Sequence, residues 1–159
     1  NLVYEVIQDL TFLIQEIYPI ALQEKGLPTT LREYVFEWEN RNDITATLTI
    51  RNERPLELGM EQAIYRIVQE ALANVARHSH ATGVGIWLVY KSDAIEVMIA
   101  DNGVGFEVNR VIRGMGLRSI RERADSIRGS LQIQSGPGLG TRIQAQAPLL
   151  RKAELRALA

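Results

Sequence analysis

Two apolar runs joined by a three-residue link constrain the fold of this chain more than any other feature. Residues 84–90 and 95–100 are rich in strand-forming side chains, and only Lys91-Ser92-Asp93 separates them. A short polar link between two such runs is typical of a hairpin turn. The sequence therefore predicts a β-hairpin in the middle of the chain.

Further strands and helices are predicted on both sides of this hairpin. Residues 44–50 alternate between aliphatic side chains and threonines, which indicates a half-buried strand. Apolar residues recur at helical spacing in three segments, two before the hairpin and one after it. Two more strands are predicted near the end of the chain. The predicted helices cover residues 30–38, 61–78 and 117–128, and the last strands cover 131–135 and 142–147. This order predicts an α+β fold, a two-layer α/β sandwich whose mixed, mainly antiparallel sheet carries helices on one face.

The N-terminal stretch, residues 1–18, is expected to form a separate helix. Val3, Ile7, Leu10, Ile14 and Ile17 are spaced 4, 3, 4 and 3 residues apart, which is a heptad seam. Such a seam fits packing on the same domain or a helical dimer stalk, and the strict spacing favours the stalk. We therefore divide the chain into an N-terminal helical segment (1–27), a globular domain (28–150) and a tail (151–159).

A stop signal and a capping signal are predicted at the junction of the first two parts. Gly26-Leu27-Pro28 is expected to end the preceding helix. Thr29 or Thr30 can then cap the next helix, with Glu33 placed to return a capping-box bond to Thr30. That helix is expected to fray in the polar run 39–43.

Composition excludes several classes of function. The 159 residues, 46% of them hydrophobic, suffice for one domain with a core of its own. The net charge of -1 gives no polyanion-binding footprint, so no nucleic-acid partner is expected. The chain has no cysteine, which excludes disulfides, thiolate metal sites and cysteine nucleophiles. No apolar run approaches the roughly 20 residues of a membrane-spanning helix, so we expect a cytoplasmic domain of a cytoplasmic or membrane-anchored protein.

One helix carries polar side chains in a line. Glu70, Asn74 and His78 stand at i, i+4 and i+8, apart from the apolar stripe of the same helix. Glu70 is a candidate general base, and the amide oxygen of Asn74 suits Mg²⁺ that already carries phosphate and water. Arg77 and His78 add positive charge for phosphate oxygens. The alternative is an ordinary exposed polar face. His78 and His80, with no cysteine and no further ligand, do not support a zinc site.

Two glycine-rich stretches follow the hairpin. Asp101-Asn102-Gly103-Val104-Gly105-Phe106 comes directly after the second strand. It reads either as a strand-ending Asx turn or as a carboxylate that accepts a hydrogen bond from an exocyclic amine, with Gly103 and Gly105 leaving room for a flat base. Gly114 and Gly116 precede a helix, where backbone N–H groups can face phosphate.

In their order and spacing these stretches resemble the ATP-binding catalytic domain of two-component sensor histidine kinases. The family belongs to a superfamily shared with gyrase B and MutL, whose Bergerat-type ATPase fold agrees with the sandwich predicted above. The resemblance extends over residues 44–149 and is strongest to the nitrate-sensor and membrane-fluidity-sensor subgroup. Four motifs carry it: Glu70-Ala71-Leu72-Ala73-Asn74-Val75-Ala76-Arg77-His78-Ser79 (N box), Asp101-Asn102-Gly103-Val104-Gly105-Phe106 (G1 box), Gly114-Met115-Gly116-Leu117 (G2 box) and Gly138-Leu139-Gly140-Thr141.

The resemblance implies a role for each matching residue. Asn74 is expected to hold the Mg²⁺ of Mg-ATP, and Glu70 to orient or activate the attacking group. Asp101 is expected to bind the adenine amino group, with Thr141 helping through water. The remaining expected nucleotide contacts are Arg77, His78, Gly103, Gly105, Phe106, Gly114, Met115, Gly116 and Leu117. Residues 107–113 are expected to form a short lid.

The resemblance also implies partners that this chain does not contain. Residues 1–27 are similar to the second helix of a dimerisation and phosphotransfer domain, so a homodimer through the missing helical hairpin and a response-regulator receiver domain are expected. No histidine precedes His78, so the phosphate acceptor is expected outside this chain. Two alternatives stay open: an ATP-hydrolysing conformational module of the gyrase B or MutL type, and a nucleotide-binding pseudokinase.

Overall fold

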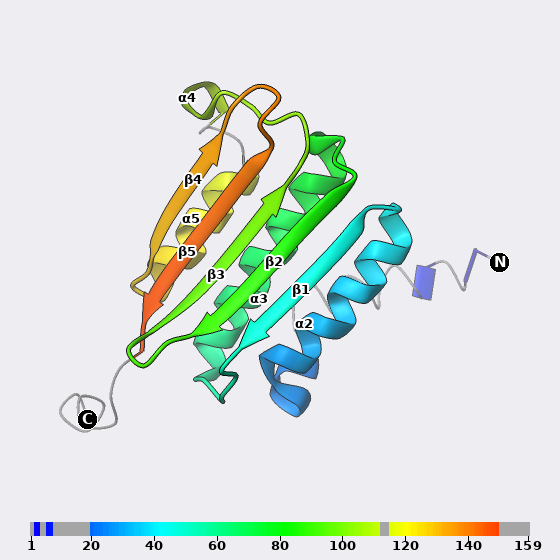
Figure 1. Ribbon diagram of the computed structural model, residues 1–159. Coiled ribbons are helices and arrows are strands. Elements are labelled where there is room, and N and C mark those ends of the chain that lie inside the picture. The colour runs from blue at the N-terminus through cyan, green and yellow to red at the C-terminus, as the bar shows by residue number, and fades with distance from the viewer. Residues whose placement is uncertain (1, 4–5, 8–19, 112–114, 150–159) are drawn as a thin grey trace.

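A single five-stranded sheet forms the framework of the domain, in a computed structural model that describes residues 2–3, 6–7, 20–111 and 115–149. The strand order is β1-β2-β3-β5-β4 (Figure 1). β1 pairs with β2 in parallel, and every other neighbouring pair is antiparallel. The strands are β1 (Thr45–Arg51), β2 (Gly83–Tyr90), β3 (Ala94–Asp101), β4 (Ser130–Ser135) and β5 (Thr141–Pro148). The predicted hairpin and the mixed, mainly antiparallel sheet are both confirmed.

The described helices are α2 (Ile20–Asn42), α3 (Leu58–Asn74), a π-helical turn η1 (Val75–Ser79) that continues α3, the short α4 (Val108–Val111) and α5 (Met115–Ser126). The longer helices α2, α3 and α5 cover one face of this sheet, and α4 lies beyond the end of β4 (Figure 1). Leu72 of α3, Ile86 of β2 and Ile120 of α5 are fully buried between the two layers. Burying one such side chain stabilises a fold by about 1.5–3 kcal/mol. The core therefore holds α3 and α5 against the sheet.

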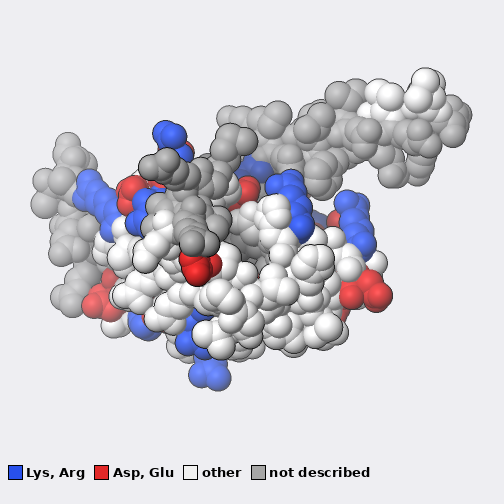
Figure 2. Space-filling model, turned by 90° about the horizontal axis from the view of Figure 1, so that it is seen from above, with Lys and Arg blue, Asp and Glu red and all other residues white. Residues whose placement is uncertain are grey.

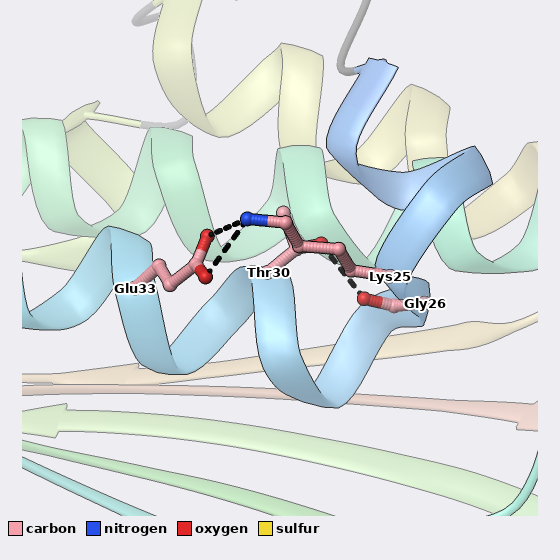
Figure 3. A network of polar contacts seen from close by, with 4 residues as sticks. All are labelled: Lys25, Gly26, Thr30 and Glu33. Atoms are coloured by element: carbon pink, nitrogen blue, oxygen red, sulfur yellow. Dashed lines mark hydrogen bonds and ion pairs between the residues drawn. The ribbon is translucent and has the colours of Figure 1, made fainter.

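The junction before the globular domain keeps the predicted stop but not the predicted cap. Gly26 has the non-helical angles φ 77° and ψ 169°, so the first helix ends there and a second helix follows at an angle within α2. The Thr30 hydroxyl donates to the Gly26 carbonyl at 2.7 Å, and Lys25 Nζ lies 3.0 Å from Glu33 Oε1 (Figure 3). Glu33 is thus engaged by a lysine across the kink instead of the predicted capping box. Leu22 and Leu27, on either side of the kink, belong to the core.

The C-terminal end of α2 is also more ordered than predicted. The polar run 39–43 does not fray, because α2 extends to Asn42. The Asn42 side chain donates to the Trp38 carbonyl at 2.8 Å, and Glu39 Oε1 accepts the Ala46 N–H at 3.0 Å. The carboxylate of Glu39 therefore satisfies a backbone donor on the edge strand β1, which links helix and sheet.

Several predictions concern residues that lie outside the described part of the chain. The heptad positions Leu10, Ile14 and Ile17 and the tail 151–159 are among them, so the dimer stalk and the proposed boundary between residues 27 and 28 stay predictions. Within the described residues, no helix has the length and apolar character required to span a membrane.

Candidate functional site

A row of polar side chains crosses the sheet where β3, β5 and β4 meet the loops. Asp101 of β3 pairs in register with Thr141 of β5, and Thr141 pairs with Ser135 of β4. Directly opposite residues on antiparallel neighbours point to the same face of a sheet. One step further into the strands, Ile99, Ile143 and Ile133 form the corresponding apolar row on the helix-covered face. The polar row therefore marks the point where the core ends and a ligand can enter.

Asp101 forms the Asx turn that its sequence predicted and also lines a cavity. Its Oδ1 accepts the Gly103 N–H at 2.8 Å, which is the Asx turn, and the same side chain lines a cavity. Burial raises the pKa of the Asp101 carboxyl, while backbone hydrogen bonds from Gly103 and Thr141 act to lower it. A carboxylate has about four acceptor sites. The turn therefore leaves acceptor capacity for a ligand.

The cavity beside Asp101 has a volume of about 710 Å³. This size is within the range of pockets that enclose a small organic ligand. Its walls come from α3 and η1, the start of α5, the loop after β3 and the ends of β3 and β5. The predicted site residues that line it are Glu70, Asn74, Arg77, His78, Asp101, Gly105, Phe106, Gly116, Leu117 and Thr141. Residues from four separate sequence stretches therefore meet around one space.

Of the other predicted residues that the structure describes, Gly103 is not among those that line the cavity. Gly103 is buried in the loop below Asp101 and donates the turn hydrogen bond. Met115 is the first residue of α5. Gly114 lies outside the described residues.

Glu70, Asn74 and Gly116 meet where α3 packs against α5. A Cβ atom added to Gly116 would lie 2.6 Å from Glu70 Oε1 and 2.9 Å from Asn74 Oδ1. The backbone at the start of α5 thus approaches a carboxylate and an amide so closely that a larger side chain at position 116 would have to displace them. Helix N-termini present unpaired N–H groups and partial positive charge. This corner of the cavity is therefore polar on both sides.

His78 does not continue the straight line predicted from Glu70 and Asn74. The helix becomes π-helical over η1, and π turns close i→i+5 hydrogen bonds, so they rotate residues away from α-helical positions. Arg77 and His78 are exposed on this turn and still border the cavity. This turn therefore places an arginine and a histidine, both exposed, at the border of the cavity.

Three serines near the site were not singled out by sequence reasoning. Ser79 ends η1, where its hydroxyl donates to the Val75 carbonyl at 2.7 Å and its own carbonyl accepts the Val104 N–H at 2.7 Å. Ser119 of α5 lines the cavity. Ser135 contacts Thr141, Gly140 and Phe106. Only the register of β4 on β5 could have identified Ser135, since it lies 29 residues from Phe106 in sequence.

Charge is dispersed around this end of the molecule. Figure 2 looks down on it, and on the part of this face that the structure describes, Lys and Arg side chains lie at several separate places around the rim. Among the described residues, no group of three His, Cys, Asp or Glu side chains is close enough to hold a metal ion. The neutral amide oxygen of Asn74, which lines the cavity, suits a hard cation that brings its own phosphate and water ligands.

Comparisons with known proteins agree with this geometry. Residues 59–151 match the family described as histidine kinase-, DNA gyrase B-, and HSP90-like ATPases. The chain is 34% identical over 146 residues to the sensor histidine kinase LiaS of Bacillus subtilis, which covers 91% of this chain and 40% of that protein. It is 33% identical over 142 residues to the sensor protein VraS of Staphylococcus aureus, which covers 89% of this chain and 41% of that protein. The chain thus spans about two fifths of the length of these relatives.

Solved structures support the same fold. The histidine kinase domain of a blue-light activated histidine kinase from Erythrobacter litoralis superposes with a TM-score of 0.67 at 18% identity, over 82% of this chain and 64% of that one. The histidine kinase AdeS of Acinetobacter baumannii superposes with a TM-score of 0.64 at 15% identity, over 91% of this chain and 81% of that one. Since the sandwich, the motif order and the matched family all coincide, the chain belongs to the histidine kinase-, DNA gyrase B- and HSP90-like ATPases, as an ATP-binding catalytic domain of the sensor histidine kinase type.

Proposed function

We propose that this domain binds Mg-ATP and transfers its γ-phosphate to a histidine that lies outside this chain. The observation that carries the proposal is the single cavity that joins the strand-end carboxylate Asp101 to the polar corner of Glu70, Asn74 and Gly116. One end can recognise a base and the other can hold phosphates. Little covalent chemistry is needed from the protein, because phosphoryl transfer depends mainly on positioning and charge neutralisation.

The base is bound at the strand ends. Asp101 accepts a hydrogen bond from the adenine amino group, and Thr141, its neighbour in register, supplies a second polar atom. Phe106 and Gly105 border the same part of the cavity. An apolar pocket with a few convergent polar groups gives both affinity and orientation.

The phosphates are bound where α3 meets α5. At Gly116 only the space of one Cβ atom separates the start of α5 from the side chains of Glu70 and Asn74. The amide oxygen of Asn74 is a suitable ligand for Mg²⁺. Bound Mg²⁺ would supply charge neutralisation for the phosphates. Asn74 would hold the ion, Glu70 would orient the attacking group, and the N–H groups at the start of α5 would face phosphate oxygens. Arg77 and His78 add charge at the rim.

The proposed partners follow from the kinase assignment. A histidine on an additional helix accepts the phosphate, a response-regulator receiver domain takes it in turn, and a homodimer forms through a helical hairpin of which residues 1–27 are part. The domain works in the cytoplasm, in a cytoplasmic or membrane-anchored protein.

Replacement of Asp101 by Asn tests the nucleotide assignment. The amide oxygen of Asn can still accept the Gly103 N–H, so the loop should keep its shape, but the charged acceptor is lost. A hydrogen bond to a charged group contributes about 1.5–3 kcal/mol, so ATP affinity measured by calorimetry should fall about 10- to 150-fold. Asp93→Asn, at the exposed hairpin end before β3, is the matched control. Equal affinities in Asp101→Asn and Asp93→Asn would refute the base pocket.

Phosphoryl transfer needs a separate experiment. A longer form of the protein that includes an upstream histidine-bearing helix should incorporate acid-labile phosphate from γ-labelled ATP. Asn74→Ala should abolish that incorporation. Tight ATP binding without any incorporation by the longer protein would favour a pseudokinase instead.

A further inference from the structure

The Ser135 hydroxyl is the centre of a hydrogen-bond network that the roles above do not use. Its Oγ lies 2.9 Å from the Phe106 nitrogen, 2.9 Å from the Gly140 carbonyl oxygen and 3.0 Å from Thr141 Oγ1. Ser135 itself is not among the residues that line the cavity, whereas Thr141 and Phe106 are. Any influence of Ser135 on a ligand must therefore act through these two neighbours.

The donors and acceptors around Ser135 determine the direction of each hydrogen bond. A serine hydroxyl has one proton to donate and two lone pairs to accept with. Phe106 N–H can only donate and the Gly140 carbonyl can only accept, so the Ser135 proton goes to Gly140. One lone pair is left for Thr141, and the Thr141 hydroxyl must therefore donate to Ser135.

This direction has a consequence for the cavity. Because the proton of Thr141 is directed to Ser135, Thr141 Oγ1 offers only lone pairs to the cavity. Asp101, its neighbour in register, offers carboxylate lone pairs at the same place. Two adjacent acceptors bind a donor, either an amino group or a water that donates to both. They oppose a carbonyl oxygen at the same position, since two acceptors have no proton to share.

We propose that Ser135 is a specificity-determining positioning residue: by fixing the Thr141 hydroxyl as an acceptor, it makes the cavity select 6-amino purines over 6-oxo purines. The proposal rests on the proposed function, since it assumes that a purine base lies beside Asp101 and Thr141. The bond to Phe106 N–H serves the same end, because it holds the loop after Asp101 against the end of β4.

The selectivity between ATP and inosine triphosphate (ITP) tests this role. The two nucleotides differ at position 6 of the base, where ITP has a carbonyl and a protonated neighbouring nitrogen. In Ser135→Ala the Thr141 hydroxyl is released and can turn its proton toward the carbonyl of ITP. The ratio of ITP to ATP dissociation constants, measured by calorimetry with Mg²⁺, should fall about tenfold, the factor that one ordinary hydrogen bond contributes. Ser135→Thr, which keeps a hydroxyl, should retain the ratio, as should Ser130→Ala on the exposed side of β4.

A double-mutant cycle separates this role from a purely structural one. Thr141→Val removes the acceptor directly and should lower the ratio by itself, even if Ser135→Ala folds poorly. In the Thr141→Val background, Ser135→Ala should have no further effect on the ratio, because residues that act as a unit are not additive. Equal loss of ATP and ITP affinity in Ser135→Ala would mean that the serine only supports the loop, and the proposal would be wrong.

Failure of the inference and failure of the proposed function give different results. If the unsubstituted protein binds neither nucleotide, the nucleotide site itself is refuted. If it binds ATP well but shows no preference over ITP, the nucleotide site stands, but recognition of the 6-amino group and with it the role of Ser135 are refuted. If the preference survives both Ser135→Ala and Thr141→Val, the base pocket stands and only the role of Ser135 is refuted.

Discussion

Gly105 offers a stringent test of how the glycine loop packs beneath the base pocket. Its φ is +63°, and an added Cβ would lie 2.1 Å from the Gly136 carbonyl oxygen and 2.8 Å from the Gly140 carbonyl oxygen. Gly138 has a similar φ of +78°, but an added Cβ there would meet no atom within 4 Å. The two glycines therefore share the backbone conformation and differ in their surroundings.

The expected cost of alanine at each position follows from this difference. An L-residue in the left-handed region costs about 1–2 kcal/mol, which is partly offset by about 0.4–1 kcal/mol because alanine restricts the unfolded chain. Gly138→Ala should thus lose about 1 kcal/mol. Gly105→Ala carries the same cost plus overpacking of about 1–3 kcal/mol, and no rotamer change can relieve it because both obstructing atoms belong to the backbone. Its total loss should be about 2–4 kcal/mol.

Urea denaturation of the two variants measures the difference. The unfolding midpoint of Gly105→Ala should lie clearly below that of Gly138→Ala, with the same dependence on denaturant concentration in both. ATP affinity should fall in Gly105→Ala only, since Gly105 lines the cavity and Gly138 does not. If the two variants lose equal stability, the loop after Asp101 does not rest on the 136–140 turn and the packing described above is wrong.

Two further predictions concern the other end of the cavity and the pH response. Gly116→Ala should leave the free energy of unfolding unchanged or raise it by up to about 1 kcal/mol, because alanine favours a helix. Its ATP affinity should nevertheless fall about tenfold, since the added Cβ displaces Glu70 and Asn74. A thermal melt checks the stability, and an ATP titration of the same sample checks the affinity. Protonation of Asp101 removes the hydrogen-bond acceptor, so nucleotide binding should weaken as the pH falls. Because the pKa of Asp101 is raised, this loss should begin at a higher pH than it would for an ordinary aspartate. The contribution of Asp101 to stability should change in the opposite sense, rising as pH falls through that pKa, because a raised folded-state pKa means tighter proton binding by the folded protein. ATP titrations at a series of acidic pH values should be made with the unsubstituted protein and with Asp101→Asn. If both showed the same pH dependence of ATP affinity, Asp101 would not be the acceptor.

The sheet and its helices could be predicted from local pattern, because their cause is local. The three-residue link after residue 90 leads into an antiparallel pair, and the alternation in residues 44–50 marks β1 to within a residue or two. The apolar stripe of the 61–78 helix appears in the structure as the buried face of α3. Periodicity reports which side of an element is buried, and in this chain burial decides the fold.

The features that sequence reasoning missed depend on contacts between distant residues. Lys25 and Glu33 are eight residues apart and meet across the break at Gly26, where two helices join at an angle. The stop at Gly26-Leu27-Pro28 could be predicted from propensity, but the angle between the two helices could not, because buried Leu22 and Leu27 hold both segments against the core. Tertiary packing therefore sets how the two helices lie relative to each other.

The end of the cavity where we propose that the base binds is held by hydrogen bonds from several elements. The Ser79 carbonyl accepts the Val104 N–H, Asn102 Oδ1 accepts the N–H groups of Thr82 and Gly83, and Ser135 accepts the Phe106 N–H. These bonds offset a local cost, because Asp101 is buried enough to raise its pKa and Gly105 occupies the left-handed region. A site whose acceptors are already oriented loses little entropy on binding. If the proposed function is correct, substitutions behind the cavity wall, such as Ser135→Ala, should therefore change selectivity for the base as strongly as substitutions within it.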